Sequence, residues 1–202
     1  PTYDVFDEYR YFEPAYEWHV MHFKGKKLAV TICEDIWNLG NNPLYRICPM
    51  DELIKQSPDI MINLSASPFD YTHVEDRKAI IKANVLKYNL PMLYCNAIGS
   101  QTEIVFDGGS LVFDQYANLI AEGKYFEEEN ITVELNDQDH FINEINTLAA
   151  DIPDVECNPF TYDPYLNIAK MHDAIVMGIK DYFSKMGFTK AILGSSGGID
   201  SA

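Results

Sequence analysis

The sequence has few basic residues, no long apolar run and no closely spaced cysteine pair. Lysine and arginine number 15 against 31 aspartates and glutamates, giving a net charge of −16 at pH 7. That charge argues against binding to nucleic-acid phosphates, and together with the missing apolar run it argues against a membrane partner. The four cysteines, at 33, 48, 95 and 157, form no CxxC pair. We therefore expect reduced thiols, no metal site built on cysteine, and a cytoplasmic location.

The residues that are present predict a folded α/β protein with a mixed, layered sheet. Apolar residues make up 47% of the chain, and short apolar strands alternate with helical patterns. We expect strands at 17–23, 27–32, 59–64, 91–95, 104–106, 110–113, 119–122, 131–135 and 190–193, and helices at 50–56, 72–88 and 164–186. Two apolar stripes at helical spacing are expected to face the core: Val74, Ile80, Ile81, Val85 and Leu86 in the second helix, and Ile168, Met171, Ile175, Ile179 and Phe183 in the third.

Periodicity is lost over residues 136–162, which collect asparagine, aspartate and proline and are therefore expected to be a linker. Residues 1–135 would then form one domain and 163–202 the start of another. Pro1 leads directly into an aromatic-rich loop, and Ala202 follows a glycine-rich turn where a helix should begin. We expect the sequence to be a window on a longer protein.

The stretch from Leu28 to Trp37 carries the first candidate site. A short buried strand runs into Cys33, and two carboxylates and an aromatic residue follow it, which predicts a strand, an abrupt turn and a helix start. A cysteine at such an elbow projects its sulfur above the sheet, and the N–H of the next residue, Glu34, points at whatever the sulfur attacks. A helix N-terminus would lower the thiol pKa, whereas Glu34 and Asp35 would raise it. The alternative is that Cys33 is a small buried apolar residue, as most free cysteines are.

The second candidate site is the glycine-rich segment at the end of the chain. Residues 190–193 read as a strand that leads into the segment 194–201, GSSGGIDS. Gly197 and Gly198 would let the backbone approach an anion, and their N–H groups would form a nest for it. No Gly-Lys-Ser/Thr follows, so this is not a Walker loop. An ordinary glycine-rich turn is the alternative.

Several motifs resemble known families. The segment 194–201 resembles the pyrophosphate loop of ATP pyrophosphatases, and residues 31–37 (TICEDIW) look like the nucleophile segment of the nitrilase, or carbon–nitrogen hydrolase, superfamily. Residues 63–69 (NLSASPF), 106–110 (FDGGS) and the opening loop 1–12 are similar to segments of its glutamine-hydrolysing members. This order of motifs resembles one family over the whole chain, the glutamine-dependent NAD synthetases.

The resemblance implies a C-terminal part of a nitrilase-like α-β-β-α sandwich, followed by the start of a Rossmann-like ATP-pyrophosphatase domain. It implies that Cys33 attacks glutamine, that ammonia amidates deamido-NAD with consumption of ATP, and that NAD, AMP and pyrophosphate are released by an assembly of identical subunits. It also implies roles for further residues: Glu8 as auxiliary catalytic carboxylate; Tyr3, Glu34, Ser65 and Ser67 at glutamine; Gly194, Ser195, Ser196, Gly197, Gly198, Asp200 and Ser201 at ATP, with Asp200 also near Mg²⁺.

The sequence departs from the family pattern in its catalytic triad. Of the expected Glu, Lys and Cys, only Cys33 can be matched, and loss of a general base typically costs about 10²–10⁴-fold. We therefore expect this stretch alone neither to hydrolyse glutamine nor to make NAD. A stand-alone amidase and an inactive interaction or regulatory module remain as alternatives.

Three other polar residues are candidates for a metal or substrate contact. His19 and His22 lack ligand partners at metal spacing and are read as surface or packing residues. Arg77 could reach a substrate carboxylate, or it could pair on a helix surface with Glu75 or Asp76. The cysteines other than Cys33 are read as structural.

Overall fold

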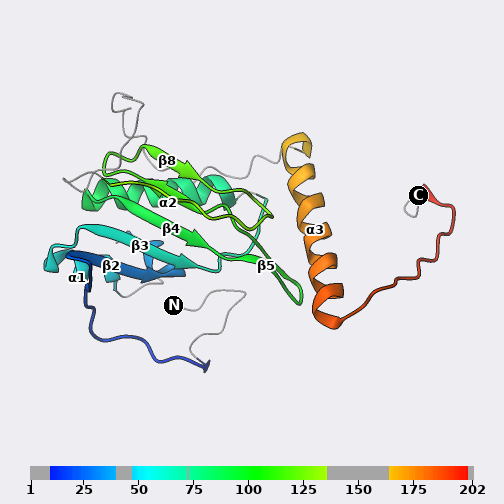
Figure 1. The fold of residues 1–202 in the computed structure, drawn as a ribbon, viewed down its shortest axis with the longest axis horizontal. Coiled ribbons are helices and arrows are strands. Elements are labelled where there is room, and N and C mark those ends of the chain that lie inside the picture. Colours follow the sequence, from blue (N-terminus) through cyan, green and yellow to red (C-terminus); the bar gives the residue numbers. More distant parts are fainter. Residues whose placement is uncertain (1–9, 40–46, 72, 136–163, 200–202) are drawn as a thin grey trace.

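A six-stranded mixed sheet forms the body of the protein (Figure 1). The computed structural model describes residues 10–39, 47–71, 73–135 and 164–199. The sheet order is β1-β2-β3-β4-β7-β8, in which β2, β3 and β4 run parallel and the other neighbours antiparallel. These strands are β1 Met21–Phe23, β2 Lys26–Ile32, β3 Ile60–Ser65, β4 Met92–Asn96, β7 Leu111–Phe113 and β8 Leu119–Glu122. The β1–β2 hairpin and the predicted mixed α/β architecture are confirmed.

Two helical crossovers pack on one face of this sheet. The first contains α1 (Pro49–Leu53) and the short helix η3 (Ile54–Gln56), and the second is α2 (His73–Tyr88). One side of each parallel strand points at these helices, as the alternation of a pleated strand requires. The resulting core includes Ala29, Ile36, Met50, Leu53, Met61, Ile81, Val85, Met92, Tyr94, Leu111 and Phe113. Because β2, β3 and β4 run parallel, their carboxyl ends meet at one end of the sheet, where open α/β sheets bind ligands.

A separate two-stranded hairpin carries the long helix α3 (Figure 1). The hairpin consists of β5 (Ile98–Gln101) and β6 (Ile104–Asp107), and α3 (Pro164–Met186) lies beside it. Both backbone polar groups of Ser100 are bound by α3: its N–H donates to Asp181 Oδ2 at 2.7 Å, and its carbonyl oxygen accepts from Lys185 Nζ. None of the described helices is both long and apolar enough to cross a membrane.

The structure differs from the predicted secondary structure and packing at several places. Residues 131–134 and 190–193 form no strand, and the latter belong to an exposed segment that extends away from the sheet. A strand needs a neighbour for its backbone hydrogen bonds, and the described residues provide none for this segment. Strand β5 was not predicted, because glycine and polar residues interrupt it. The side chains of Ile168, Ile175 and Ile179 are exposed rather than in the core, as is Leu86 of α2.

The buried face of α2 contains polar residues besides the predicted apolar stripe. Val74, Ile81 and Val85 are buried as expected, but Arg77 and Asn84 on the same face are buried as well, at 1% and 0% exposure. Apolar periodicity does not detect polar residues that are buried with partners.

Candidate functional site

Cys33 lies at the elbow that the sequence predicted. β2 ends at Ile32, and the 3₁₀ helix η2 (Cys33–Ile36) begins at once. Cys33 has φ of +44°, a conformation that non-glycine residues rarely adopt. Asp35 Oδ2 accepts a hydrogen bond from the N–H of Ile32 at 2.9 Å, which ties the turn to the end of β2. Strained residues of this kind concentrate at functional sites.

The elbow opens into a cavity of about 470 Å³ at the carboxyl ends of three parallel strands. Its lining comes from β2 and the elbow, from the end of β3 and the residue after it, and from β4: Ile32, Cys33, Leu64, Ser65, Ala66, Cys95, Asn96 and Ala97. Strand register brings them together, since Ile32 lies opposite Leu64, Leu64 opposite Cys95, and Ser65 opposite Asn96. The cavity is largely apolar with a few convergent polar groups, as small-molecule sites usually are.

The Cys33 thiol is partly buried in this cavity, and burial raises its pKa above the ordinary value. The charge of Glu34 acts in the same direction, as the sequence predicted. Three groups act against it: the backbone of Ala66, the hydroxyl of Ser65 and the backbone of Glu34 all face the sulfur and favour its thiolate form. Burial is the largest cause, so the net shift is upward. The thiol is therefore held protonated at neutral pH, and attack would require a base to take its proton.

Of the residues expected at glutamine and described by the structure, Ser65 lines the cavity, whereas Glu34 and Ser67 are not among the lining residues. Ser65 Oγ donates to Asn63 Oδ1 at 2.7 Å, and the amide of Asn63 reaches the carbonyl oxygen of Cys33 at 3.4 Å. Asn63 is fully buried. It was not singled out from the sequence, because a lone asparagine in an apolar strand gives no chemical signal.

Arg77 is buried rather than on a helix surface, and its partner is a carboxylate far along the chain. Its guanidinium is 1% exposed and forms two hydrogen bonds with the buried carboxylate of Asp107, at 3.0 and 3.3 Å. It also approaches Ser67 Oγ at 3.5 Å and lies 5.9 Å from the ring of Tyr94. The Tyr94 hydroxyl faces Ser65, and burial raises its pKa. The ion pair thus lies behind the serine side of the cavity, and it was missed because its partners are 30 residues apart.

The motif at 106–110 shapes the wall of the same region. Asn96 Nδ2 donates to Asp107 Oδ1 at 3.2 Å and to the carbonyl oxygen of Gly108 at 2.8 Å, while Asn96 Oδ1 accepts from the N–H of Ser67 at 2.9 Å. Gly109 has φ of +65°, and a Cβ there would lie 2.3 Å from the ring of Tyr125. The second glycine of the motif is therefore required by conformation and by close approach.

The glycine-rich segment is described only as far as Ile199. Gly197 has φ of +74°, a Cβ there would meet no atom within 4 Å, and Gly198 N–H donates to Ser196 Oγ at 3.3 Å. Asp200 and Ser201 lie outside the described residues, as do Tyr3, Glu8 and Cys157. Within the described part of the chain, no group of three or more His, Cys, Asp or Glu side chains could hold a metal ion.

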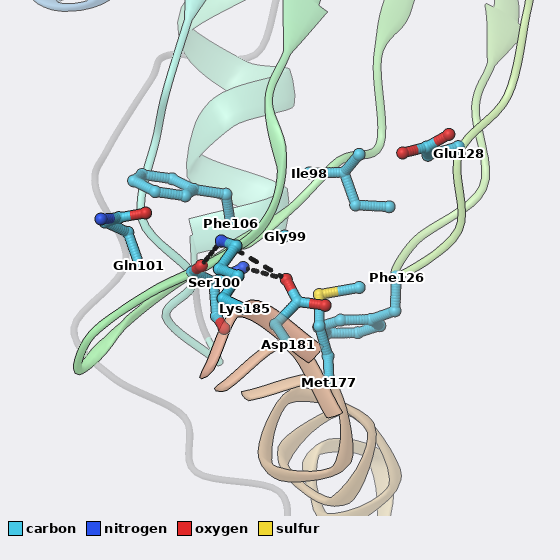
Figure 2. A pocket seen from close by; sticks show the side chains of 10 residues that line it. All are labelled: Ile98, Gly99, Ser100, Gln101, Phe106, Phe126, Glu128, Met177, Asp181 and Lys185. Atoms are coloured by element: carbon cyan, nitrogen blue, oxygen red, sulfur yellow. Dashed lines mark hydrogen bonds and ion pairs between the residues drawn. The ribbon is translucent and has the colours of Figure 1, made fainter. Parts of the chain in front are cut away.

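A second cavity, of about 550 Å³, lies between the β5–β6 hairpin and α3 (Figure 2). Figure 2 shows Asp181 and Lys185 of α3 pointing at the backbone of Ser100. Ser100 Oγ also donates to the carbonyl oxygen of Gly178 at 3.5 Å. Three of the polar residues that line this cavity, Ser100, Asp181 and Lys185, are thus engaged in holding the helix on the hairpin.

Comparison with known proteins confirms the resemblance that the motifs predicted. The chain is 34% identical over 207 residues to a glutamine-dependent NAD(+) synthetase from Synechocystis sp., and 36% identical over 220 residues to one from Thermotoga maritima. Each alignment covers the whole chain, but only 34% and 37% of the relatives. The chain thus spans about a third of the length of the curated relatives it matches. No family model matches it.

Solved structures agree with the fold. The glutamine-dependent NAD+ synthetase from Acinetobacter baumannii, determined in complex with ADP, superposes with a TM-score of 0.78 at 29% identity, covering all of this chain and 34% of that one. A carbon–nitrogen hydrolase from Helicobacter pylori matches with a TM-score of 0.51 at 22% identity, over 62% of this chain and 46% of that one. The second match supports the nitrilase-like fold alone.

Proposed function

We propose that this chain provides the nucleophile of a glutamine-dependent NAD synthetase and the beginning of its ATP-using domain. The observation that carries the proposal is Cys33, held at φ of +44° at the edge of the sheet with its thiol in a cavity beside Ser65. Similarity to glutamine-dependent NAD synthetases over the whole of this chain, and about a third of theirs, supports the choice of substrate.

In the proposed reaction, the Cys33 sulfur loses its proton to a base and attacks the side-chain amide carbon of glutamine. The carbonyl oxygen becomes an oxyanion, for which the N–H of Glu34 would be a donor. Collapse breaks the C–N bond, the nitrogen leaves as ammonia with a proton, and a thioester to Cys33 remains. Water then hydrolyses the thioester to glutamate and restores the thiol. The raised pKa of Cys33 makes the base essential.

The cavity favours Ser65 as a direct contact of glutamine, because its hydroxyl lines the cavity. Ser67 would act from behind that wall, where its N–H and hydroxyl contact Asn96 and Arg77. Glu34 would contribute through its backbone N–H rather than its carboxylate. Tyr3 and Glu8 stay predictions of the resemblance, as contacts of glutamine and as an auxiliary carboxylate.

The glycine-rich segment would bind the phosphates of ATP through Gly194, Ser195, Ser196, Gly197 and Gly198. A positive φ at Gly197, with no atom within 4 Å of the place a Cβ would take, fits a backbone that approaches an anion closely. Asp200 and Ser201 would complete the loop, and Asp200 would hold Mg²⁺. ATP, when bound, would activate the carboxylate of deamido-NAD for attack by ammonia.

The domain division is part of the same proposal: residues 1–135 for glutamine hydrolysis, 136–162 as a linker and 163–202 for the start of the synthetase domain. Contacts between α3 and the β5–β6 hairpin mean that the two units would be joined directly as well as by the linker. A cytoplasmic assembly of identical subunits completes it, and the unpaired thiols of Cys33, Cys48 and Cys95 fit a reducing location.

The test uses the intact protein and its Cys33→Ala variant, with glutamine or ammonium chloride as nitrogen source and deamido-NAD and ATP present. We expect the variant to lose glutamate release and glutamine-dependent NAD formation, while NAD formation from ammonium persists. Cys48→Ala, which changes a buried free thiol that does not line this cavity, is the matched control and should keep glutamine-dependent synthesis. Full glutamine-dependent activity in Cys33→Ala would overturn the proposal. Glutamine hydrolysis by the unmodified protein with no ATP-dependent NAD formation would favour a stand-alone amidase.

A further inference from the structure

Two buried asparagines from different elements hold the turn that contains Cys33. Asn63 lies on β3 and Asn84 on α2, and both side chains are 0% exposed. Asn63 Nδ2 donates to the carbonyl oxygen of Cys33 at 3.4 Å and to Thr31 Oγ1 at 3.0 Å. Asn84 Nδ2 donates to the carbonyl oxygen of Ile36 at 2.8 Å. The first and last carbonyl oxygens of the four-residue turn are therefore each bound by a buried amide.

The burial of these amides is not explained by packing alone. Asn84 Oδ1 has no hydrogen-bond partner among the described residues, and an unpaired buried acceptor destabilises a fold. An apolar side chain of similar size would avoid that cost. Asn63, in contrast, uses its oxygen as well: it accepts from Ser65 Oγ at 2.7 Å. One side chain thus connects the Cys33 backbone to a hydroxyl that lines the cavity.

We propose that Asn63 and Asn84 are positioning residues, which clamp the Cys33–Ile36 turn so that Cys33 keeps its positive φ and its sulfur stays in the cavity beside Ser65. The inference rests on the proposed role of Cys33 as nucleophile. A short 3₁₀ turn leaves carbonyl oxygens without partners at its end, and a non-glycine residue stays at positive φ only when its surroundings enforce it. The two amides provide that enforcement from β3 and α2.

The expected effect is a selective change at Cys33. In Asn63→Ala the turn should relax, and water should reach the sulfur. Iodoacetamide labelling of Cys33 at pH 7 should then rise at least about fivefold, the size expected for loss of one buried hydrogen bond, and the midpoint of its pH profile should fall. Backbone amides of residues 34–37 should exchange hydrogen faster. Labelling of Cys95, which lines the same cavity, should stay within about twofold of its wild-type rate. The intact protein is labelled, and both thiols are then quantified by peptide mass spectrometry.

Asn84→Leu separates positioning from packing. This change removes the unpaired buried oxygen, but it also leaves the carbonyl oxygen of Ile36 without its side-chain donor. A purely structural role predicts wild-type labelling of Cys33 and wild-type exchange at 34–37, whatever the change in melting temperature. Positioning predicts altered Cys33 labelling and faster exchange at 34–37, both measured well below the melting temperature of the variant. Gln56→Ala is the matched control, because that side chain bonds the N–H of Val20 and the carbonyl oxygen of Trp18 away from the turn.

The inference is overturned if Asn63→Ala and Asn84→Leu leave both Cys33 labelling and exchange at 34–37 at wild-type values. It is also overturned if Gln56→Ala changes both as much as they do. Failure of the proposed function would give a different result, because glutamine hydrolysis would survive Cys33→Ala. Amide exchange at 34–37 would still show whether Asn63 and Asn84 hold the Cys33–Ile36 turn.

Discussion

The buried ion pair between Arg77 and Asp107 gives the largest predicted effect on stability. Both side chains are 1% exposed, and the guanidinium reaches both carboxylate oxygens. Asp107→Ala would leave the buried guanidinium of Arg77 without its counter-charge. The Nε of that guanidinium already has no hydrogen-bond partner among the described residues. Breaking such a pair from one side costs about 3–5 kcal/mol. For a protein of this size we expect the melting temperature to fall by about 6–20 °C.

Thermal unfolding followed by tryptophan fluorescence is a suitable assay, because Trp18 and Trp37 both pack against the core. The double variant Arg77→Met/Asp107→Leu should recover most of the loss, since replacing a buried ion pair by apolar residues is often neutral. If Asp107→Ala lowered stability by less than about 1 kcal/mol, the pair would behave as a solvent-exposed one. The reasoning from burial would then be refuted.

Three further predictions concern the glycine motif, the thiol and the helix contact. Gly109→Ala places a Cβ 2.3 Å from the ring of Tyr125 at φ of +65°, so we expect it to destabilise the fold by at least about 1 kcal/mol in thermal unfolding. Because burial raises the pKa of Cys33, its iodoacetamide labelling rate should still rise with pH beyond about 8.5, where a free cysteine is half ionised. Asp181→Ala removes the acceptor of the Ser100 N–H, so hydrogen exchange of the 98–106 peptide should increase, by about tenfold for a lost charge-assisted bond.

Matched controls make these predictions decisive. Gly25→Ala changes another positive-φ glycine with nothing within 4 Å of the added Cβ, and it should cost less than Gly109→Ala. An equal cost for the two would contradict the close-approach argument. Lys180→Ala changes an exposed residue next to Asp181 and should leave exchange of the hairpin unchanged. A Cys33 labelling rate that levels off below pH 8.5 would contradict the effect of burial.

The elbow and its neighbouring strands were predictable from local sequence. The apolar run before Cys33 and the abrupt change in pattern after it are local signals, and they predict the elbow. A place for Ser65 beside Cys33 was implied only by the family resemblance. The extended segment at residues 190–193 was not predictable in the same way. Its residues favour a strand, but a strand also requires a paired neighbour, and composition does not say whether one is present.

The sequence by itself determined which candidate site segments the chain contains and their order: a cysteine elbow, a serine-bearing strand end and a glycine-rich segment. Only the tertiary structure decided which buried polar residues surround the cysteine elbow and the serine-bearing strand end. Asn63, Asn84, Arg77 and Asp107 each find their partners on other elements, up to 48 residues away. Hydrogen bonds and ion pairs depend on distance in space, whereas local patterns report only neighbours along the chain, so a buried amide or guanidinium reveals its role only when the elements have packed.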